Sequence, residues 1–425
     1  MKFLNTQDFA QQLDAADSLR SFRQQFLFPQ HNGKDAIYFL GNSLGLQPKR
    51  TATDMAEVMQ QWQELGVESW FKGDKPWLQY HDKLVGPLAA IVGALPGEIV
   101  VMNSLTVNLH LMLASFYQPK GKRNKIICEA KAFPSDQYTL ETHVKQRGFK
   151  PEDVIVEVAP REGEVNIRHE DVLAAIEANK DELALIFWGG LNYYTGQVFN
   201  MKTITAAAHA VGAMVGFDLA HAAGNIQLQL HNWDVDFACW CSYKYLNSGP
   251  GAIGGVYIHE RFHNDKELPR FAGWWGYNKA TRFKMQPGFD PIPSAEGWQL
   301  STPSVLLYAA HYSSLQLFEK AGMSSLYQKG QQLSDYLLFL LQDLNANSSQ
   351  PIVQVLTPKE NKGCQVSMLM LRNGREVFDA LTDAGVFADW REPNVIRIAA
   401  VPMYNTFEEV WQFAQIMKTT CEQFQ

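Results

Sequence analysis

One stretch of the chain, residues 211–255, constrains the fold more than any other. It contains two apolar segments, residues 213–217 and 235–241, which have the length of strands and no alternation of polar and apolar residues. Such segments are typical of strands in a parallel sheet that is covered on both faces. The first segment ends at Asp218 and the second leads into Lys244. Because ligands of open α/β sheets bind at the carboxyl ends of the strands, we expect this acid and this amine to share one site.

An amine and an acid at such an edge suit pyridoxal 5'-phosphate as a cofactor. The Lys244 amine can bond covalently to the cofactor aldehyde when it is unprotonated. Asp218 can keep the pyridine nitrogen protonated, which makes the ring a better acceptor of electrons. A plainer interpretation is a surface lysine and a polar strand end, since strands often end in polar residues. The wider sequence favours the cofactor.

Several longer segments, spread in order over almost the whole chain, carry a wider pattern. They are GNSLGLQPK (residues 41–49), SLTVNLHLML (104–113), EAKAFPSD (129–136), YTGQVFN (194–200), GFDLAHAAGN (216–225), DFACWCSYKYLNSGPG (236–251), TRFKM (281–285) and REPNVIRIAAVP (391–402). Together these segments resemble the kynureninases, a family of pyridoxal-phosphate enzymes with the aspartate-aminotransferase type of fold. The match is more specific than the aspartate and lysine that this fold type shares.

The resemblance implies a fold class, a domain organisation and an activity. The expected fold is α/β, with a fold type I large domain built on a mainly parallel seven-stranded sheet and a smaller α+β C-terminal domain. We expect residues 1–50 to join the small domain, residues 51–310 to form the large cofactor-binding domain, and residues 311–425 to form the small domain. The implied reaction is hydrolysis of the Cβ–Cγ bond of L-kynurenine, and of its 3-hydroxy form, to L-alanine and anthranilate or 3-hydroxyanthranilate, in tryptophan catabolism. The implied assembly is a homodimer with shared active sites.

Catalytic and cofactor-binding residues can be assigned from the same resemblance. Lys244 holds the cofactor and then removes the Cα proton, Asp218 faces the ring nitrogen, and Tyr243 contacts the phosphate and takes part in proton transfer. Leu105 and Thr106 lie where a predicted helix begins, and a helix N-terminus suits a phosphate. The full set of implied cofactor contacts is Leu105, Thr106, Phe133, Pro134, Ser135, Asp136, Asp218, His221, Tyr243, Lys244, Trp274 and Thr302.

Some of these contacts have a plainer structural explanation. Phe133 is expected to stack on the pyridine ring, but it could instead be a core residue at a strand end. Asp136 either bonds the cofactor region or caps the helix that follows. His221 either contacts the ring or only orients Asp218. Gly189 stands where many relatives have serine, so we expect no side-chain contact there.

The substrate is expected to contact four further residues. Arg397 can pair bidentately with an amino-acid carboxylate, because its guanidinium presents two parallel N–H groups. Asn42 and Ser43 form a turn that lies near the substrate in the family. Trp70 falls where the family contacts the aryl ring, and tryptophan there favours L-kynurenine over its 3-hydroxy form. The residues that match Trp274 and Thr302 act in part across a subunit boundary in the family, which is the basis for expecting a dimer.

Composition restricts the class of protein further. The formal net charge is −7 and no basic block occurs, which argues against binding nucleic acid or a membrane surface. The first residues lack the apolar segment of a secretory signal, and no apolar run is long enough to span a membrane. The five cysteines are scattered and odd in number, as in cytoplasmic proteins with buried thiols. We therefore expect a cytoplasmic protein; the resemblance implies an enzyme with a small-molecule amino-acid substrate and no metal.

Two motifs and one cysteine offer alternatives. Residues 249–254 fit G-x-G-x-x-G, but a strand pattern follows where a dinucleotide site needs a helix. Residues 259–263 fit the H-E-x-x-H of zinc peptidases, but a short exposed turn is the better interpretation because both histidines would need one helical face. Within pyridoxal-phosphate enzymes the alternative is an aminotransferase or a cysteine desulfurase, with Cys364 as the candidate reactive thiol. A non-catalytic relative is disfavoured by the intact Asp218, Lys244 and Arg397.

Periodicity and turn residues predict the remaining elements. Helices are expected over residues 6–26, 51–65, 107–116, 168–179, 202–211, 305–320, 326–345 and 375–384. Strands are expected over residues 37–40, 125–129, 154–157, 183–188, 251–259, 352–355, 364–371 and 395–398.

Overall fold

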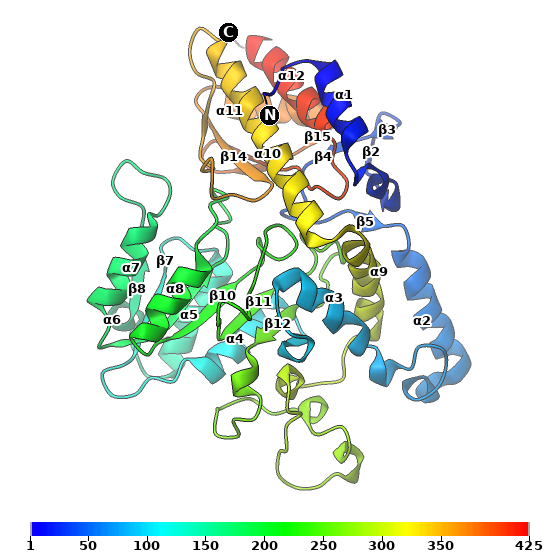
Figure 1. Cartoon of the computed structure of the whole chain (residues 1–425), viewed down its shortest axis with the longest axis vertical. Helices are drawn as coiled ribbons and strands as arrows, with labels where there is room; N and C mark the ends of the chain where they lie inside the picture. The colour runs from blue at the N-terminus through cyan, green and yellow to red at the C-terminus, as the bar shows by residue number, and fades with distance from the viewer. Residues whose placement is uncertain (1, 424–425) are drawn as a thin grey trace.

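The computed structural model describes residues 2–423 and has two lobes (Figure 1). The larger lobe contains a seven-stranded sheet in which five neighbouring strands, from β11 to β8, run parallel. Strand β12 is antiparallel to both of its neighbours. In spatial order the strands are β6 (Ile99–Val101), β12 (Gly255–Ile258), β11 (Phe237–Trp240), β10 (Met214–Asp218), β9 (Leu183–Gly189), β7 (Lys125–Glu129) and β8 (Ile155–Val158). The expected mainly parallel sheet of seven strands is confirmed.

The strands are apolar throughout because both faces of the sheet are buried. In β9, Leu185 and Phe187 pack into a core beneath α4 (Leu105–Phe116) and α5 (Pro134–Gln146). Ile186 and Trp188 point the other way into the largest core of the molecule. This second face is covered by α3 (Asp82–Val92), α7 (His169–Ala178), α8 (Met201–Ala210), α2 (Thr51–Leu65) and α9 (Val305–Ala321).

The ring of Phe237 on β11 covers one position of β10 so closely that this position requires glycine. Gly216 pairs with Phe237 in the parallel register of the two strands. A Cβ atom added to Gly216 would lie 1.9 Å from the Phe237 ring. The same register places Asp218 opposite Cys239, so the loop that follows β11 starts beside the carboxyl end of β10.

The smaller lobe contains both described ends of the chain (Figure 1). Its four-stranded antiparallel sheet has the order β13 (Val353–Val355), β14 (Gln365–Met370), β17 (Val395–Ala399) and β16 (Asp389–Arg391). Helices α10 (Met323–Ala346), α11 (Gly374–Asp383) and α12 (Phe407–Gln423) complete the lobe, with α1 (Gln7–Ala16) packed on α12. The N-terminal strand β4 (Ile37–Tyr38) pairs with β15 (Val386–Phe387). The domain limits at residues 50 and 310 stay a prediction.

The structure corrects some of the predicted boundaries. The helix expected over residues 6–26 ends at Ala16, and a 3-10 helix, η1 (Arg20–Gln25), follows. At the end of α1, Asp17 takes an extended backbone and its carboxylate accepts the Leu19 N–H, an alternative to helical hydrogen bonding. The strand expected over residues 251–259 starts only at Gly255.

Several elements of the structure were not predicted, among them α3, β6, β15, β16 and α12. No helix within residues 2–423 has the length and apolar character that a membrane span requires.

Candidate active site

A cavity of about 200 Å³ lies at the carboxyl ends of β7, β9 and β10. It contains both Asp218 and Lys244, so the acid and the amine expected to flank one ring do share one site. The cavity is lined by Ser104, Leu105, Thr106, Glu129, Ala132, Phe133, Ser135, Asp136, Gly189, Leu191, Tyr193, Asp218, Ala220, His221, Tyr243 and Lys244.

Lys244 lies in the cavity beside residues from two other loops. Its Nζ lies 2.9 Å from His221 Nε2 and 5.8 Å from the centre of the Phe133 ring. Burial, together with the charges of Lys244 and Arg397, lowers the pKa of His221 well below its usual value. The imidazole is therefore neutral at pH 7 and its Nε2 can accept a hydrogen bond from the amine. The other ring nitrogen, Nδ1, is buried and finds no hydrogen-bond partner among the described residues.

The loop that carries Lys244 is fixed from behind by a buried histidine. His311, on α9, is fully buried; its Nδ1 lies 2.5 Å from Ser248 Oγ and its Nε2 3.4 Å from Ser242 Oγ. The segment 41–49 packs on the same loop, where the Gly45 N–H donates to the Tyr243 carbonyl over 2.8 Å. A side chain at Gly45 would collide with the backbone of the loop, because a Cβ atom would lie 2.3 Å from the Lys244 carbonyl oxygen.

Three carboxyl groups gather around the end of β10. Asp218 accepts the Ala220 N–H over 2.7 Å and forms a hydrogen bond with the buried Asp136. Burial raises the pKa of both aspartates, so the pair retains a proton unless a cation joins it. Burial likewise raises the pKa of Glu129, at the end of β7, to about 7. Its carboxylate accepts a hydrogen bond from Asn192.

Glu129 is a site residue that sequence reasoning missed. It was assigned only as the last residue of a strand, and a strand-end acid carries no specific signal. Its position next to Asp218 becomes evident only when β7 and β10 are placed on either side of β9. Tyr193 is a second residue of the cavity wall that no local sequence signal indicates. Its carbonyl accepts hydrogen bonds from Gln365 and Arg397, and its ring meets that of Phe133 edge to face at 5.3 Å.

The N-terminus of α4 forms another wall of the cavity. Ser104 occupies the expected N-cap position, but its hydroxyl makes no capping hydrogen bond. Leu105 and Thr106 are the first two helical residues, and N–H groups in the first turn of a helix have no acceptor within the helix. Such a terminus binds phosphate through its free N–H groups and partial positive charge.

The residues of this cavity fit pyridoxal phosphate. The start of α4 offers donors to a phosphate, the Lys244 amine can hold an aldehyde, and the face of Phe133 is available to an aromatic ring. Lys244 is the one cation that lowers the pKa of both hydrogen-bonded aspartates within the described residues. A protonated pyridine nitrogen would be a second cation beside them. Of the expected cofactor contacts, Leu105, Thr106, Phe133, Ser135, Asp136, Asp218, His221, Tyr243 and Lys244 line the cavity.

Three expected cofactor contacts lie outside the wall of this cavity. Pro134 is exposed at the first position of α5. Trp274 is 43% exposed and meets Phe283 edge to face at 5.6 Å, and Thr302 is also exposed. A single chain therefore does not bring Trp274 and Thr302 to the cofactor cavity.

Arg397 lies behind the cavity and not in its wall. Its side chain is buried on β17, where its two terminal nitrogens donate to the Tyr193 carbonyl and to the Asp389 carboxylate. Burial lowers its pKa to about 10, which leaves the guanidinium charged at pH 7. These two bonds use two of the five N–H donors of the guanidinium, and its Nε has no partner among the described residues.

The other three expected substrate contacts also lie outside the cavity wall. Asn42 is buried and donates to Gln365 over 3.2 Å, while Ser43 is exposed. Trp70 is partly buried and packs edge to face against Trp77 and Trp275, each at 5.4 Å.

The alternative motifs do not form the sites that their patterns suggested. His263 bonds the Ile258 carbonyl and His259 faces Glu98, so the two histidines do not converge on one ion. Both are buried, which corrects the expectation of an exposed turn. Between them lies only a 3-10 turn, η5 (Glu260–Phe262), and the glycines of residues 249–254 lead into strand β12 without a helix.

Cys364 does not have the environment of a reactive thiol. It is buried, and burial raises its pKa to about 12. A nucleophilic cysteine needs a lowered pKa and access to substrate, so the desulfurase alternative lacks its key residue here. All five cysteines are buried and free.

Comparison with known proteins places the chain among close relatives. The family model "Kynureninase C-terminal domain" matches residues 326–417. The protein named kynureninase from Flavobacterium johnsoniae is 56% identical over 98% of this chain and 99% of its own length. The kynureninase from Myxococcus xanthus is 48% identical over 98% of this chain and 97% of its own.

Solved structures of other enzymes share the fold at low identity. The cystine C-S lyase C-DES, in complex with its product cysteine persulfide, superposes with a TM-score of 0.74 at 21% identity, covering 90% of this chain and 97% of that one. The cysteine desulfurase of Thermococcus onnurineus has a TM-score of 0.74 at 18% identity, covering 91% and 95%. These likenesses establish the fold, whereas the close relatives establish the family. On the strength of those relatives, the chain belongs to the kynureninase family.

Proposed function

We propose that the protein is a pyridoxal-phosphate-dependent hydrolase that cleaves L-kynurenine with water to anthranilate and L-alanine. One observation carries the proposal: Lys244, Asp218 and the start of α4 meet in one cavity of a chain that is 56% identical to a protein named kynureninase. The same chemistry applies to 3-hydroxy-L-kynurenine, which would give 3-hydroxyanthranilate.

Each wall of the cavity has its own part in holding the cofactor. The N–H groups of Leu105 and Thr106 would hold the phosphate, with Tyr243 also in the cavity wall. Phe133 would hold the ring, and Asp218 would keep its nitrogen protonated. When bound, pyridoxal phosphate supplies an aldehyde for the substrate amine and a ring that withdraws electrons from the substrate Cα.

The proton transfers belong to Lys244 and its neighbours. Lys244 is released when the substrate amine takes its place, and the free amine is then the base nearest the Cα proton. His221 accepts a hydrogen bond from this amine over 2.9 Å and so orients it. Water adds to the γ-carbonyl of the substrate and the Cβ–Cγ bond breaks, which releases the carboxylic acid of anthranilate. Cβ then takes up a proton, and return of a proton to Cα in place of the one removed completes L-alanine. Tyr243 is the second candidate proton donor, because burial raises the pKa of its phenol and keeps it protonated at pH 7.

A homodimer would complete the site. Trp274 and Thr302 are expected near the cofactor but are exposed on their own chain, as residues that serve a neighbouring subunit would be. Aromatic side chains surround Trp274: Phe71 and Phe283 are 54% and 52% exposed and lie 6.0 Å apart. Such a cluster is typical of a surface that is covered on assembly. We place the dimer in the cytoplasm, where its buried free thiols persist.

The decisive experiment measures both products. Purified enzyme supplied with L-kynurenine should release anthranilate, detected by fluorescence, and L-alanine in equal amounts. Lys244→Ala should fold normally and release neither product, while Lys202→Ala, at an exposed position on α8, should keep full activity. Normal anthranilate release by Lys244→Ala would overturn the scheme, and formation of a 2-oxo acid in place of alanine would instead indicate an aminotransferase. Turnover of the 3-hydroxy form in the same assay tests the preference assigned to Trp70.

A further inference from the structure

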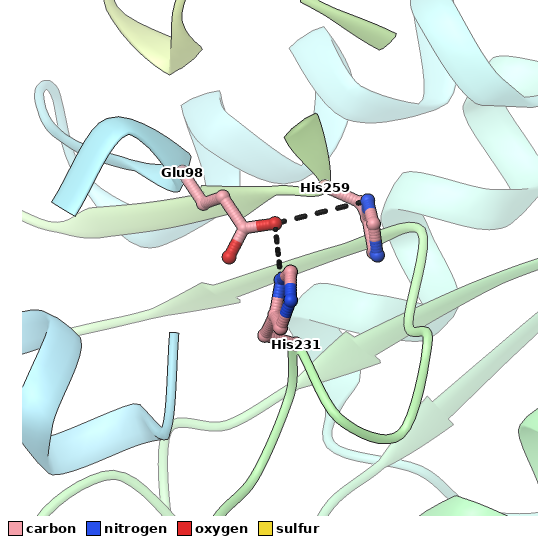
Figure 2. A group of neighbouring side chains, drawn as sticks. All are labelled: Glu98, His231 and His259. Carbon is pink, nitrogen blue, oxygen red and sulfur yellow. Dashed lines mark hydrogen bonds and ion pairs between the residues drawn. The ribbon is translucent and has the colours of Figure 1, made fainter. Parts of the chain in front are cut away.

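Two histidines and a glutamate meet at the edge of the large sheet opposite the cofactor cavity (Figure 2). Glu98 ends the 3-10 helix η4 (Pro96–Glu98) just before β6. His231 lies in the connection between β10 and β11, and His259 directly follows β12. Because β12 runs antiparallel to β11, its end lies beside the start of β11, whereas Lys244 lies beyond the end of β11. The function proposed above uses none of these three side chains.

The three ligand atoms have nearly the spacing that a zinc ion requires. Glu98 Oε1 lies 3.0 Å from His231 Nδ1 and 3.7 Å from His259 Nδ1, and all three atoms lie within 4.8 Å of one another. A tetrahedral Zn²⁺ with bonds of about 2.0–2.1 Å separates its ligands by about 3.4 Å. The imidazole rings are stacked, with centroids 5.2 Å apart and planes at 21°. Small movements of the three side chains would therefore bring their ligand atoms around one ion.

Neighbouring groups fix the ligands in the form that binds metal. His259 Nε2 lies 3.2 Å from the Asp234 carboxylate, and its Nδ1 accepts the Arg261 N–H over 3.2 Å. The proton is thus on Nε2, and the lone pair of Nδ1, which the Arg261 N–H occupies here, lies 3.7 Å from Glu98 Oε1 and is the one a metal would use. A carboxylate behind a histidine is the usual second layer of a zinc site. The Glu98 side chain is fully buried, and its oxygens also accept the N–H groups of Leu95 and Glu260 over 2.9 and 3.0 Å.

The charge around the three ligands favours a cation. Glu98, Asp234 and Asp236 supply three negative charges. The guanidinium of Arg261, which forms ion pairs with Asp234 and Asp236, supplies one positive charge. The hydrogen bond that His209 donates to the Asp236 carboxylate raises the pKa of this fifth group. Even with His209 protonated, the carboxylates exceed the cations by one. His231 has 30% of its side chain exposed, which gives an ion a path from solvent.

A second cluster of similar composition shows the contrast. His81, Asp82 and Glu296 also bring their ligand atoms within 4.8 Å of one another. There the Lys279 ammonium lies 2.9 Å from Glu296 and 3.7 Å from Asp82, so a cation of the chain itself already serves the carboxylates. We therefore propose no metal site at this second cluster.

We propose that Glu98, His231 and His259 form a Zn²⁺ site, with water as the fourth ligand. Binding moves the His231 proton from Nδ1 to the exposed Nε2 and displaces the Arg261 N–H from His259. The ion would tie together the segment before β6, the β10–β11 connection and the end of β12. Because it binds the folded chain alone, it should stabilise the protein without entering the hydrolase reaction.

The test uses the holoenzyme, treated with EDTA, dialysed and titrated with ZnCl₂ by calorimetry. We expect one ion per chain, a higher midpoint of thermal unfolding with zinc, and nitrogen and oxygen ligands in the X-ray absorption spectrum. His231→Gln should bind at least tenfold more weakly and lose the thermal shift. His169→Gln, which removes a partly exposed histidine on α7, should behave as the parent.

Kynurenine turnover by His231→Gln at the parental rate confirms that this variant is folded. Equal zinc affinity of His231→Gln and the parent would overturn the proposal, as would sulfur ligands in the absorption spectrum or no saturable binding by the parent. None of these results bears on the hydrolase assignment, which rests on product release and Lys244.

Discussion

His311, which supports the loop of Lys244, should make the folded protein sensitive to acid. It is fully buried, and burial lowers its pKa from 6.5 to about 3. A histidine whose pKa is depressed on folding contributes stability above its unfolded pKa, and this contribution is lost as the pH falls toward the folded pKa. The window of loss therefore runs from about pH 6.5 down to about pH 3.

The size of the effect follows from the shift. One pKa unit corresponds to about 1.4 kcal/mol, so the full loss over the window is on the order of 5 kcal/mol. Between pH 6.5 and 4.5 the free energy of unfolding should fall by about 2 kcal/mol through this residue alone. His311→Asn removes the titrating ring, and its amide can still reach Ser248, which contacts Nδ1 in the parent.

The assay is urea unfolding of parent and variant, followed by tryptophan fluorescence at several pH values from 6.5 to 4.5. Other titrating groups are common to both proteins and cancel in the difference between them. We expect the stability advantage of the parent to shrink by about 1 kcal/mol for each pH unit on this acid side. A difference that stays constant over the range would refute the assignment of a buried, neutral His311.

Two further substitutions test the substrate site and the sheet. Arg397→Lys should raise KM for the amino acid more than it lowers kcat, because lysine keeps the charge near Asp389 but loses the paired N–H groups; a fall in kcat at unchanged KM would contradict the carboxylate assignment. Gly216→Ala should lower the free energy of unfolding by roughly 1–3 kcal/mol, since its Cβ would overlap the Phe237 ring, and Phe237→Leu in the same chain should restore part of the loss. Unchanged urea unfolding of Gly216→Ala would show that β10 and β11 are not packed as closely as described.

Sequence reasoning located the centre of the site because its signals are local. The uninterrupted apolar segments that end near Asp218 and Lys244 are typical of strands covered on both faces, and parallel neighbours bring their carboxyl ends to one edge. The helix at residues 51–65 was predicted with the limits that α2 has. In each case the neighbours along the chain determine the structure.

The remaining features depend on contacts between distant segments or on weak local signals. Helix α3 contains Pro87 directly after Gly86, two residues that argue against a helix interior, and packing of Leu84 and Leu88 in the core outweighs them. Helix α12 has apolar residues at helical spacing, so its absence from the predicted helices is not due to a missing local signal. The engagement of Arg397 by Asp389 could not be foreseen, because it depends on the pairing of β16 with β17.

The burial of every cysteine makes it practical to label the protein at introduced cysteines and so to measure its conformational changes. With all five native thiols shielded, a cysteine introduced at an exposed position will be the one that a dye reaches first. Val67 in the large lobe and Leu371 in the small one are 74% and 48% exposed. Energy transfer between fluorophores attached at these two positions would report the distance between the lobes. A movement of the lobe that contains Arg397 on binding or release of the amino acid would change that distance.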